Sequence, residues 1–310
     1  MPNTAAGSVG LEVLSRRWDP EAVVGAEPER RTRYSLECHM SGCSELAIRT
    51  ISALVLAPLA IGVAYLGGFP FVLFCGLAAI GIWWEWATLS AEIVRSAIAT
   101  GAGALIAAAV FLTAGWSGTA TACLVGGAFA VGAMGRPQGR PWIGGGVAYA
   151  GVMLVAPVLV RSDPDYGFVA IMFLFAAVWA TDIVAYFAGR AIGGPKLAPR
   201  LSPNKTWSGA LAGGGGAVVA TLTVARAAGL DHLAMLAWIG LALSVASQAG
   251  DLFESALKRW HGAKDASRLI PGHGGLMDRL DGFIAAALAA TILGVLRAGT
   301  AAPARGLLVW

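Results

Sequence analysis

Nine apolar runs follow one another along the chain, and short polar connections separate them. They lie near residues 50–66, 70–89, 97–115, 119–134, 142–160, 168–189, 208–227, 233–250 and 282–298. A helix that crosses the hydrocarbon core of a bilayer needs about 20 mainly apolar residues. The pattern therefore predicts an all-α fold, a polytopic bundle of about nine transmembrane helices. The fourth run is short and rich in glycine, and without it the count falls to eight.

The chain outside these runs is polar at its N-terminal end. We expect residues 1–46 to form a disordered polar tail. Because Met40 would make an ordinary start just before the first span, we add the hypothesis that residues 1–39 are dispensable or a mis-called start. The predicted organisation continues with N-terminal spans over 47–165, a catalytic transmembrane region over 166–300 and a tail over 301–310.

The composition agrees with the pattern of spans and excludes an ordinary soluble domain. Hydrophobic residues make up 57% of the 310 positions and charged residues 13%. Soluble domains are about 45–50% apolar and about 25% charged. The net charge of +4 is explained by basic inner loops or by an anionic substrate, so it does not indicate nucleic-acid binding.

Basic residues are distributed unevenly among the connections, and this predicts the orientation of the spans. With the N-terminus inside, the inner connections hold four basic residues between 190 and 205 and five between 258 and 279. The positive-inside rule then places the C-terminus outside and the connections 190–207 and 251–281 on the cytoplasmic face. We expect a multi-pass protein of the inner (plasma) membrane with its site facing the cytoplasm, at the ends of the C-terminal spans.

The first polar segment is "WATDIVAYFAGRAIGGPKLAPRLSPNKTW", residues 179–207. Asp182 interrupts an apolar run, and an ionisable group inside a span is a functional candidate, although a salt bridge to Arg190 would explain it structurally. We interpret "SPNKT" as an anion-binding turn that opens the next helix: Pro203 and the hydroxyls suit an N-terminal cap, and Lys205 adds a charge.

The second polar segment is "QAGDLFESALKRWHGAKDASRLIPGHGGLMDRLDG", residues 248–282. Here we expect the eighth span to continue as a helix through 248–259, so that charges three and four residues apart share a face. Asp278 and Asp281 then follow on one side of the first turn of the last span, where a helix N-terminus stabilises carboxylates.

This mixture of charges predicts phosphoryl or nucleotidyl transfer. Clustered carboxylates repel one another unless a cation lies between them, and ligands that are all oxygen favour Mg²⁺, with a second or a monovalent cation as an addition. Nearby lysines and arginines suit phosphate, and no nucleophile with its base is present.

His273 is either a base, a phosphate ligand or a loop residue. The tryptophans around Glu85 in "WWEWATL" indicate an interfacial belt, and we assign the glutamate no role.

The stretch "SALKRWHGAKDASRLIPGHGGLMDRLD", residues 255–281, resembles the signature of the phosphatidate cytidylyltransferases, also called CDP-diacylglycerol synthases. The upstream "TDIVAYFAGR", "SPNKTWSG" and "GDLFES" are similar to that family too. The resemblance is strong over about 179–282 and general before that.

The resemblance implies a reaction in which CTP and phosphatidate give CDP-diacylglycerol and pyrophosphate with Mg²⁺. It implies metal ligands at Asp251, Asp278 and Asp281, catalytic roles for Asp251, Asp281, Lys258, Ser255 and His273, and phosphate binding by Lys205, Ser202, Arg259, Lys264 and Arg279. It also implies a homodimer.

Two rival functions remain at this point. A transferase that uses CDP-activated lipids has a different aspartate pattern, and the apolar run after Gly282 does not continue it. An ion- or proton-coupled transporter would explain Asp182 and Asp281, but not the lysines and arginines gathered on one face; transporters of this kind are commonly built from internal repeats, and none is visible here.

Overall fold

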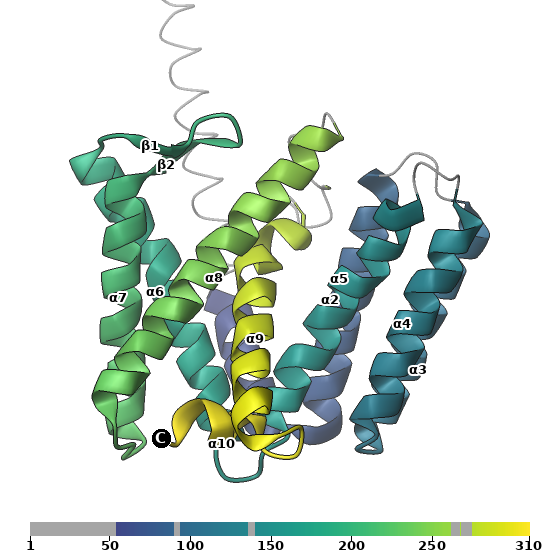
Figure 1. The fold of residues 1–310 in the computed structure, drawn as a ribbon, viewed down its shortest axis with the longest axis horizontal. Helices are drawn as coiled ribbons and strands as arrows, with labels where there is room; N and C mark the ends of the chain where they lie inside the picture. Colours follow the sequence, from purple (N-terminus) through teal and green to yellow (C-terminus); the bar gives the residue numbers. More distant parts are fainter. Residues whose placement is uncertain (1–53, 90–93, 136–139, 262–266, 268–274) are drawn as a thin grey trace, which may run out of the picture. The chain divides into compact units, whose positions relative to one another are not determined.

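The computed structural model describes residues 54–89, 94–135, 140–261, 267 and 275–310. This part of the chain is almost entirely helical (Figure 1). A helix over Leu54–Leu66 comes first. The elements that follow are α2 (Gly68–Leu89), α3 (Arg95–Thr113), α4 (Ser117–Met134), α5 (Arg140–Arg161), α6 (Gly167–Ile192), β1 (Lys196–Ala198), β2 (Ser202–Thr206), α7 (Trp207–Ala227), α8 (Leu233–Trp260), α9 (Met277–Ala298) and α10 (Pro303–Leu308).

The structure confirms the all-α polytopic fold. Among the described residues, eight helices, α2 to α9, are long and apolar enough to cross a membrane. The first predicted span, near 50–66, falls on the shorter helix Leu54–Leu66, and residues 50–53 lie outside the described residues. The short, glycine-rich run near 119–134, without which the predicted count would fall to eight, is the helix α4. The predicted tail 1–46 also lies outside the described residues.

Small residues allow the helices of the C-terminal half to approach closely. A methyl group added at Gly250 of α8 would lie 2.5 Å from the carbonyl oxygen of Asp281 in α9, and one added at Gly282 would lie 2.5 Å from the Ser247 hydroxyl oxygen. Because glycine has no side chain, the two backbones can cross almost in contact. This crossing fixes where the acidic residues beside it lie.

The connection between α6 and α7 is a β-hairpin, which corrects the interpretation of "SPNKT" as a turn that opens a helix. Lys196 pairs with Thr206 and Ala198 with Ser202, so Ser202 lies in a strand and does not cap α7. The cap is Thr206, whose hydroxyl oxygen accepts a hydrogen bond from the Gly209 amide at 3.1 Å. A hydroxyl of "SPNKT" thus caps α7 as predicted, and it is that of Thr206, which Lys205 precedes directly.

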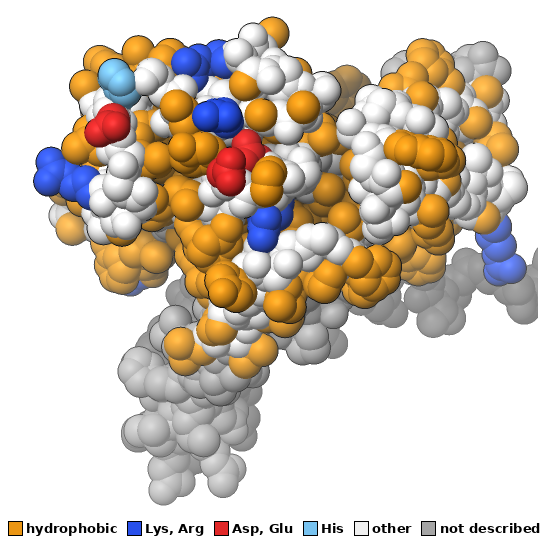
Figure 2. Space-filling view, turned by 90° about the horizontal axis from the view of Figure 1, so that it is seen from below, with side chains coloured by type: hydrophobic (Ala, Val, Ile, Leu, Met, Phe, Trp, Pro, Cys, Tyr) orange, Lys and Arg blue, Asp and Glu red, His pale blue; other side chains and the backbone are white. Residues whose placement is uncertain are grey.

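The segment 301–310, predicted as a tail, contains the short helix α10. It lies at the end of the bundle opposite the hairpin (Figure 1). Seen from that end, hydrophobic side chains cover much of the face (Figure 2). The buried carboxylate of Asp163 accepts hydrogen bonds from the amides of Asp165 and Tyr166 at 3.0 Å and of Arg305 at 3.1 Å. Asp163 therefore ties α10 to the loop between α5 and α6.

Candidate active site

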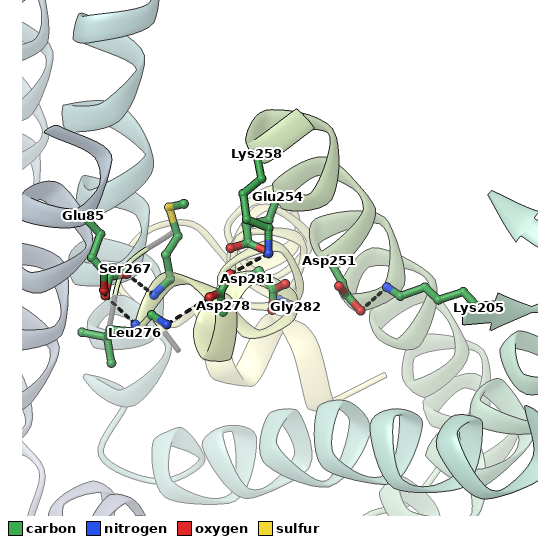
Figure 3. Close-up of polar contacts among 12 residues, drawn as sticks. Glu85, Lys205, Asp251, Glu254, Lys258, Ser267, Leu276, Asp278, Asp281 and Gly282 are labelled. Carbon is green, nitrogen blue, oxygen red and sulfur yellow. Dashed lines mark hydrogen bonds and ion pairs between the residues drawn. The ribbon is translucent and has the colours of Figure 1, made fainter. Parts of the chain in front are cut away.

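Carboxylates and lysines gather where the last turns of α8 meet the first turn of α9 (Figure 3). The group is called here the carboxylate–lysine cluster, and its members are Lys205, Asp251, Glu254, Lys258, Asp278 and Asp281. Two expectations are confirmed: α8 runs on to Trp260, and Asp278 lies in the first turn of α9. Helical geometry therefore brings acids from both helices to one end of the bundle.

Asp251 and Asp281 lie on either side of the α8–α9 crossing. Asp251 forms an ion pair with Lys205, the residue that β2 presents just before the start of α7. Asp281 is 9% exposed, and its Oδ1 accepts a hydrogen bond from the Gly282 amide at 2.7 Å. The close backbone contact at Gly250 holds these two acids near each other, within electrostatic range.

Lys258 joins two further carboxylates of the cluster. Its ammonium donates to Asp278 Oδ1 at 2.6 Å and forms an ion pair with Glu254 Oε2 at 2.8 Å. The other oxygen of Asp278 accepts a hydrogen bond from the Gly275 amide at 3.0 Å. Both oxygens of Asp278 are thus engaged by the protein, whereas the buried Oε1 of Glu254 has no hydrogen-bond partner among the described residues. Asp278 orients Lys258 in this arrangement.

The structure adds Glu85, to which the sequence pattern assigned no role. Its carboxylate is fully buried at the end of α2. Oε1 accepts hydrogen bonds from the Ser267 hydroxyl at 2.6 Å and from the Leu276 amide at 2.7 Å, and Oε2 accepts one from the Met277 amide at 2.6 Å. The one available signal was a glutamate inside an apolar run, which is costly unless it is paired.

The tryptophans beside Glu85 correct the prediction of an interfacial belt. Trp83 and Trp86 are 1% and 3% exposed, and only Trp84, at 51%, is exposed. Trp83 donates its indole N–H to the Ile98 carbonyl at 3.0 Å, and Trp86 donates to the Trp142 carbonyl at 3.1 Å. These two side chains therefore hold α2 against α3 and α5 instead of facing outward from the bundle.

Other predicted site residues lie around the cluster. Asp182 is within electrostatic range of Asp251, Lys205 and Arg279. No ion pair joins it to Arg190, whose guanidinium donates to the Tyr186 hydroxyl at 2.9 Å. Arg259 and Arg279 are exposed, and Ser255 is half-buried on α8. Lys264 and His273 lie outside the described residues, so their roles stay predictions.

The donor set fits a magnesium ion that a substrate helps to bind. Among the described residues, no three His, Cys, Asp or Glu side chains are placed to hold a metal by themselves. Mg²⁺, however, often takes one or two carboxylates and completes its coordination with water and substrate phosphates. Asp251 and Asp281 supply two such carboxylates on facing helices. Asp278, which we also predicted as a ligand, binds Lys258 and the Gly275 amide through its two oxygens in this structure, and its role as a ligand stays a prediction.

The fold is that of a polytopic membrane protein. Carboxylates and lysines gather where α8 and α9 meet, and this gives the protein a candidate enzyme site. The profile described as "Cytidylyltransferase family" matches residues 47–296. The chain belongs to this cytidylyltransferase family and is a nucleotidyltransferase. The match covers the N-terminal spans as well as the cluster, so the family relationship extends beyond the region of the sequence signature.

Curated relatives carry a more specific name. A phosphatidate cytidylyltransferase of Brucella abortus biovar 1 (strain 9-941) is 41% identical over 262 residues, which cover 82% of this chain and 94% of the relative. One of Pseudomonas aeruginosa is 39% identical over 263 residues, covering 77% and 93%. One of Haemophilus influenzae is 40% identical over 148 residues, covering 44% and 49%.

Proposed function

We propose that this protein transfers CMP from CTP to phosphatidate, giving CDP-diacylglycerol and pyrophosphate. The observation that carries the proposal is the cluster itself: Asp251 and Asp281 lie close to the glycine crossing of α8 and α9, with Lys205 and Lys258 beside them. Carboxylates suit a hard cation and lysines suit phosphate. The relatives' name supplies the nucleotide and the lipid.

In the proposed reaction a phosphate oxygen of the lipid attacks the α-phosphorus of CTP. The bond from that phosphorus to the bridging oxygen breaks, and pyrophosphate leaves with the electron pair. A phosphate oxygen is already ionised near neutral pH, so no general base is needed. The task of the protein is to place the two substrates in line and to balance charge.

Residues of the cluster divide this task between them. Asp251 and Asp281 would hold Mg²⁺, which, when bound, neutralises phosphate charge. Lys205, which pairs with Asp251, exchanges that partner for a substrate phosphate. Lys258, held by Glu254 and Asp278, presents a fixed positive charge to the triphosphate. Arg259 and Arg279 lie exposed near the same end and bind further phosphate oxygens.

The placement of the site agrees with a lipid substrate. The cluster lies toward the end of α8 and the beginning of α9, both membrane-spanning helices. A headgroup at the membrane surface and a nucleotide from the aqueous phase can therefore meet there. We propose that this end faces the cytoplasm at the inner membrane and that the protein forms a homodimer.

The decisive experiment is a lipid-product assay with purified protein in detergent. Labelled CTP, phosphatidate and Mg²⁺ are supplied together, and we expect labelled CDP-diacylglycerol and pyrophosphate in equal amounts. Omission of phosphatidate or replacement of CTP by ATP serves as the control and should give no lipid product. If CDP-lipid does not form under any of these conditions, while ion transport is found in vesicles, the enzyme proposal is wrong.

A further inference from the structure

Helix α9 begins without a capping side chain of its own. The residue at its N-terminal boundary is Leu276, whose side chain makes no cap hydrogen bond, and the local Asp278 accepts from the amide of Gly275 and not from those of Leu276 and Met277. The first amides of any helix need acceptors from outside the helix. Here the acceptor is Glu85, whose two oxygens bind the amides of Leu276 and Met277 (Figure 3).

Glu85 is itself held rigidly, so it can act as a fixed reference point. Trp83 and Trp86 flank it on α2 and are hydrogen-bonded to the backbone of α3 and α5. The carboxylate is fully buried and accepts a third hydrogen bond from Ser267. Its negative charge also lies at the N-terminal end of α9, where the helix dipole favours an anion.

The first turn of α9 is also where the site is built. Asp278 is one residue after Met277, and Asp281 is one helical turn further on. We propose that Glu85 is a positioning residue for the reaction: by fixing the start of α9, it sets where Asp281 faces Asp251 and where Asp278 holds Lys258. Glu85 does not touch the substrates. This inference rests on the proposed function, because it assigns Glu85 a task in that reaction.

The test combines an activity-independent measurement with turnover. In Glu85→Gln the amide group keeps one acceptor oxygen and places N–H groups opposite backbone N–H donors. Hydrogen–deuterium exchange of the peptide 275–281 should therefore become faster than in the wild type. We expect kcat to fall about tenfold or more, since small displacements of catalytic groups are costly, while the KM for CTP changes much less.

Asp163→Asn is the matched control. Asp163 is also a buried carboxylate that accepts three hydrogen bonds, but it lies at the opposite end of the bundle. This variant should lower the unfolding midpoint as Glu85→Gln does, yet leave kcat within about twofold and peptide 275–281 unchanged, because distant sites act independently. Equal losses of kcat in the two variants would mean that Glu85 acts only through stability, and the proposal would be wrong.

Two milder variants keep the test decisive if Glu85→Gln does not fold. Glu85→Asp retains the charge and should lower kcat by less than about tenfold; Ser267→Ala removes one hydrogen bond and should give a still smaller fall, each with faster exchange in 275–281. Unchanged exchange in 275–281, or faster exchange with wild-type kcat, contradicts the positioning role. A wild-type protein that makes no CDP-lipid refutes the proposed function, and the exchange comparison still decides whether Glu85 holds α9.

Discussion

Replacement of Lys258 by methionine removes the only described ammonium between two carboxylates. Lys258 pairs with Asp278 at 2.6 Å and with Glu254 at 2.8 Å, and Glu254 is 2% exposed. Methionine matches the length of the aliphatic chain, so the variant changes charge more than volume. It leaves Glu254 and Asp278 facing each other without a counter-charge.

The size of the effect follows from burial. Removal of one partner of a buried ion pair costs about 3–5 kcal/mol, because the remaining charge is left uncompensated. The side chains of Lys258 and Asp278 are 15% and 16% exposed, so water screens part of this repulsion and we take the lower end, about 3 kcal/mol. The expected loss thus corresponds to about a hundredfold change in the ratio of folded to unfolded protein.

The assay is denaturant unfolding in mixed micelles, followed by tryptophan fluorescence. Lys196→Met is the control, because Lys196 is an exposed lysine of the hairpin, and we expect a change within about 0.5 kcal/mol. Adding Glu254→Gln to Lys258→Met should restore about half of the loss, since a neutral amide needs no counter-charge. A loss no larger than that of Lys196→Met, or a double variant less stable than Lys258→Met alone, would refute the reasoning.

Four further predictions concern the proposed reaction and the helix crossing. Asp281→Asn should lower turnover by about two orders of magnitude or more with unchanged helix content by circular dichroism; near-normal turnover would remove Asp281 from the metal set. Gly250→Ala should cost about 1–3 kcal/mol of unfolding free energy by overpacking against Asp281, whereas Gly215→Ala, with open space at its added methyl group, should be neutral or stabilising. Lys205→Met should raise the KM for CTP in steady-state assays, and an unchanged KM would exclude phosphate binding by Lys205. EDTA should abolish turnover and excess Mg²⁺ restore it; activity that survives chelation would contradict metal dependence.

The spans could be predicted because a membrane helix is a local feature of the sequence. Its length and apolar content are set by the bilayer, not by distant partners. The predicted 233–250 and 282–298 were short at one end because α8 and α9 carry their charged turns beyond the apolar run. Both extensions were expected from the sequence, and with them the charges three and four residues apart share a helical face.

The parts that were missed depend on contacts between distant residues or on weak local signals. The partners of Glu85 lie 182 to 192 positions away, and no pattern around the residue indicates them. The hairpin strands contain proline and asparagine, which are depleted in strands, so propensity opposed the correct assignment. Trp83 and Trp86 resemble a membrane belt in sequence, and only their packing shows that they are buried.

The contact between Glu85 and α9 also constrains the order of biosynthesis. Leu276 and Met277, whose amides donate to Glu85, follow that residue in the chain by 191 and 192 positions, so the ribosome adds them much later. Six of the eight long helices, α3 to α8, are made in between. During that time the Glu85 carboxylate of α2 lacks its final hydrogen-bond donors, so α2 can reach its native environment only after translation has passed the start of α9. Assembly of the first long span is therefore completed by the last one.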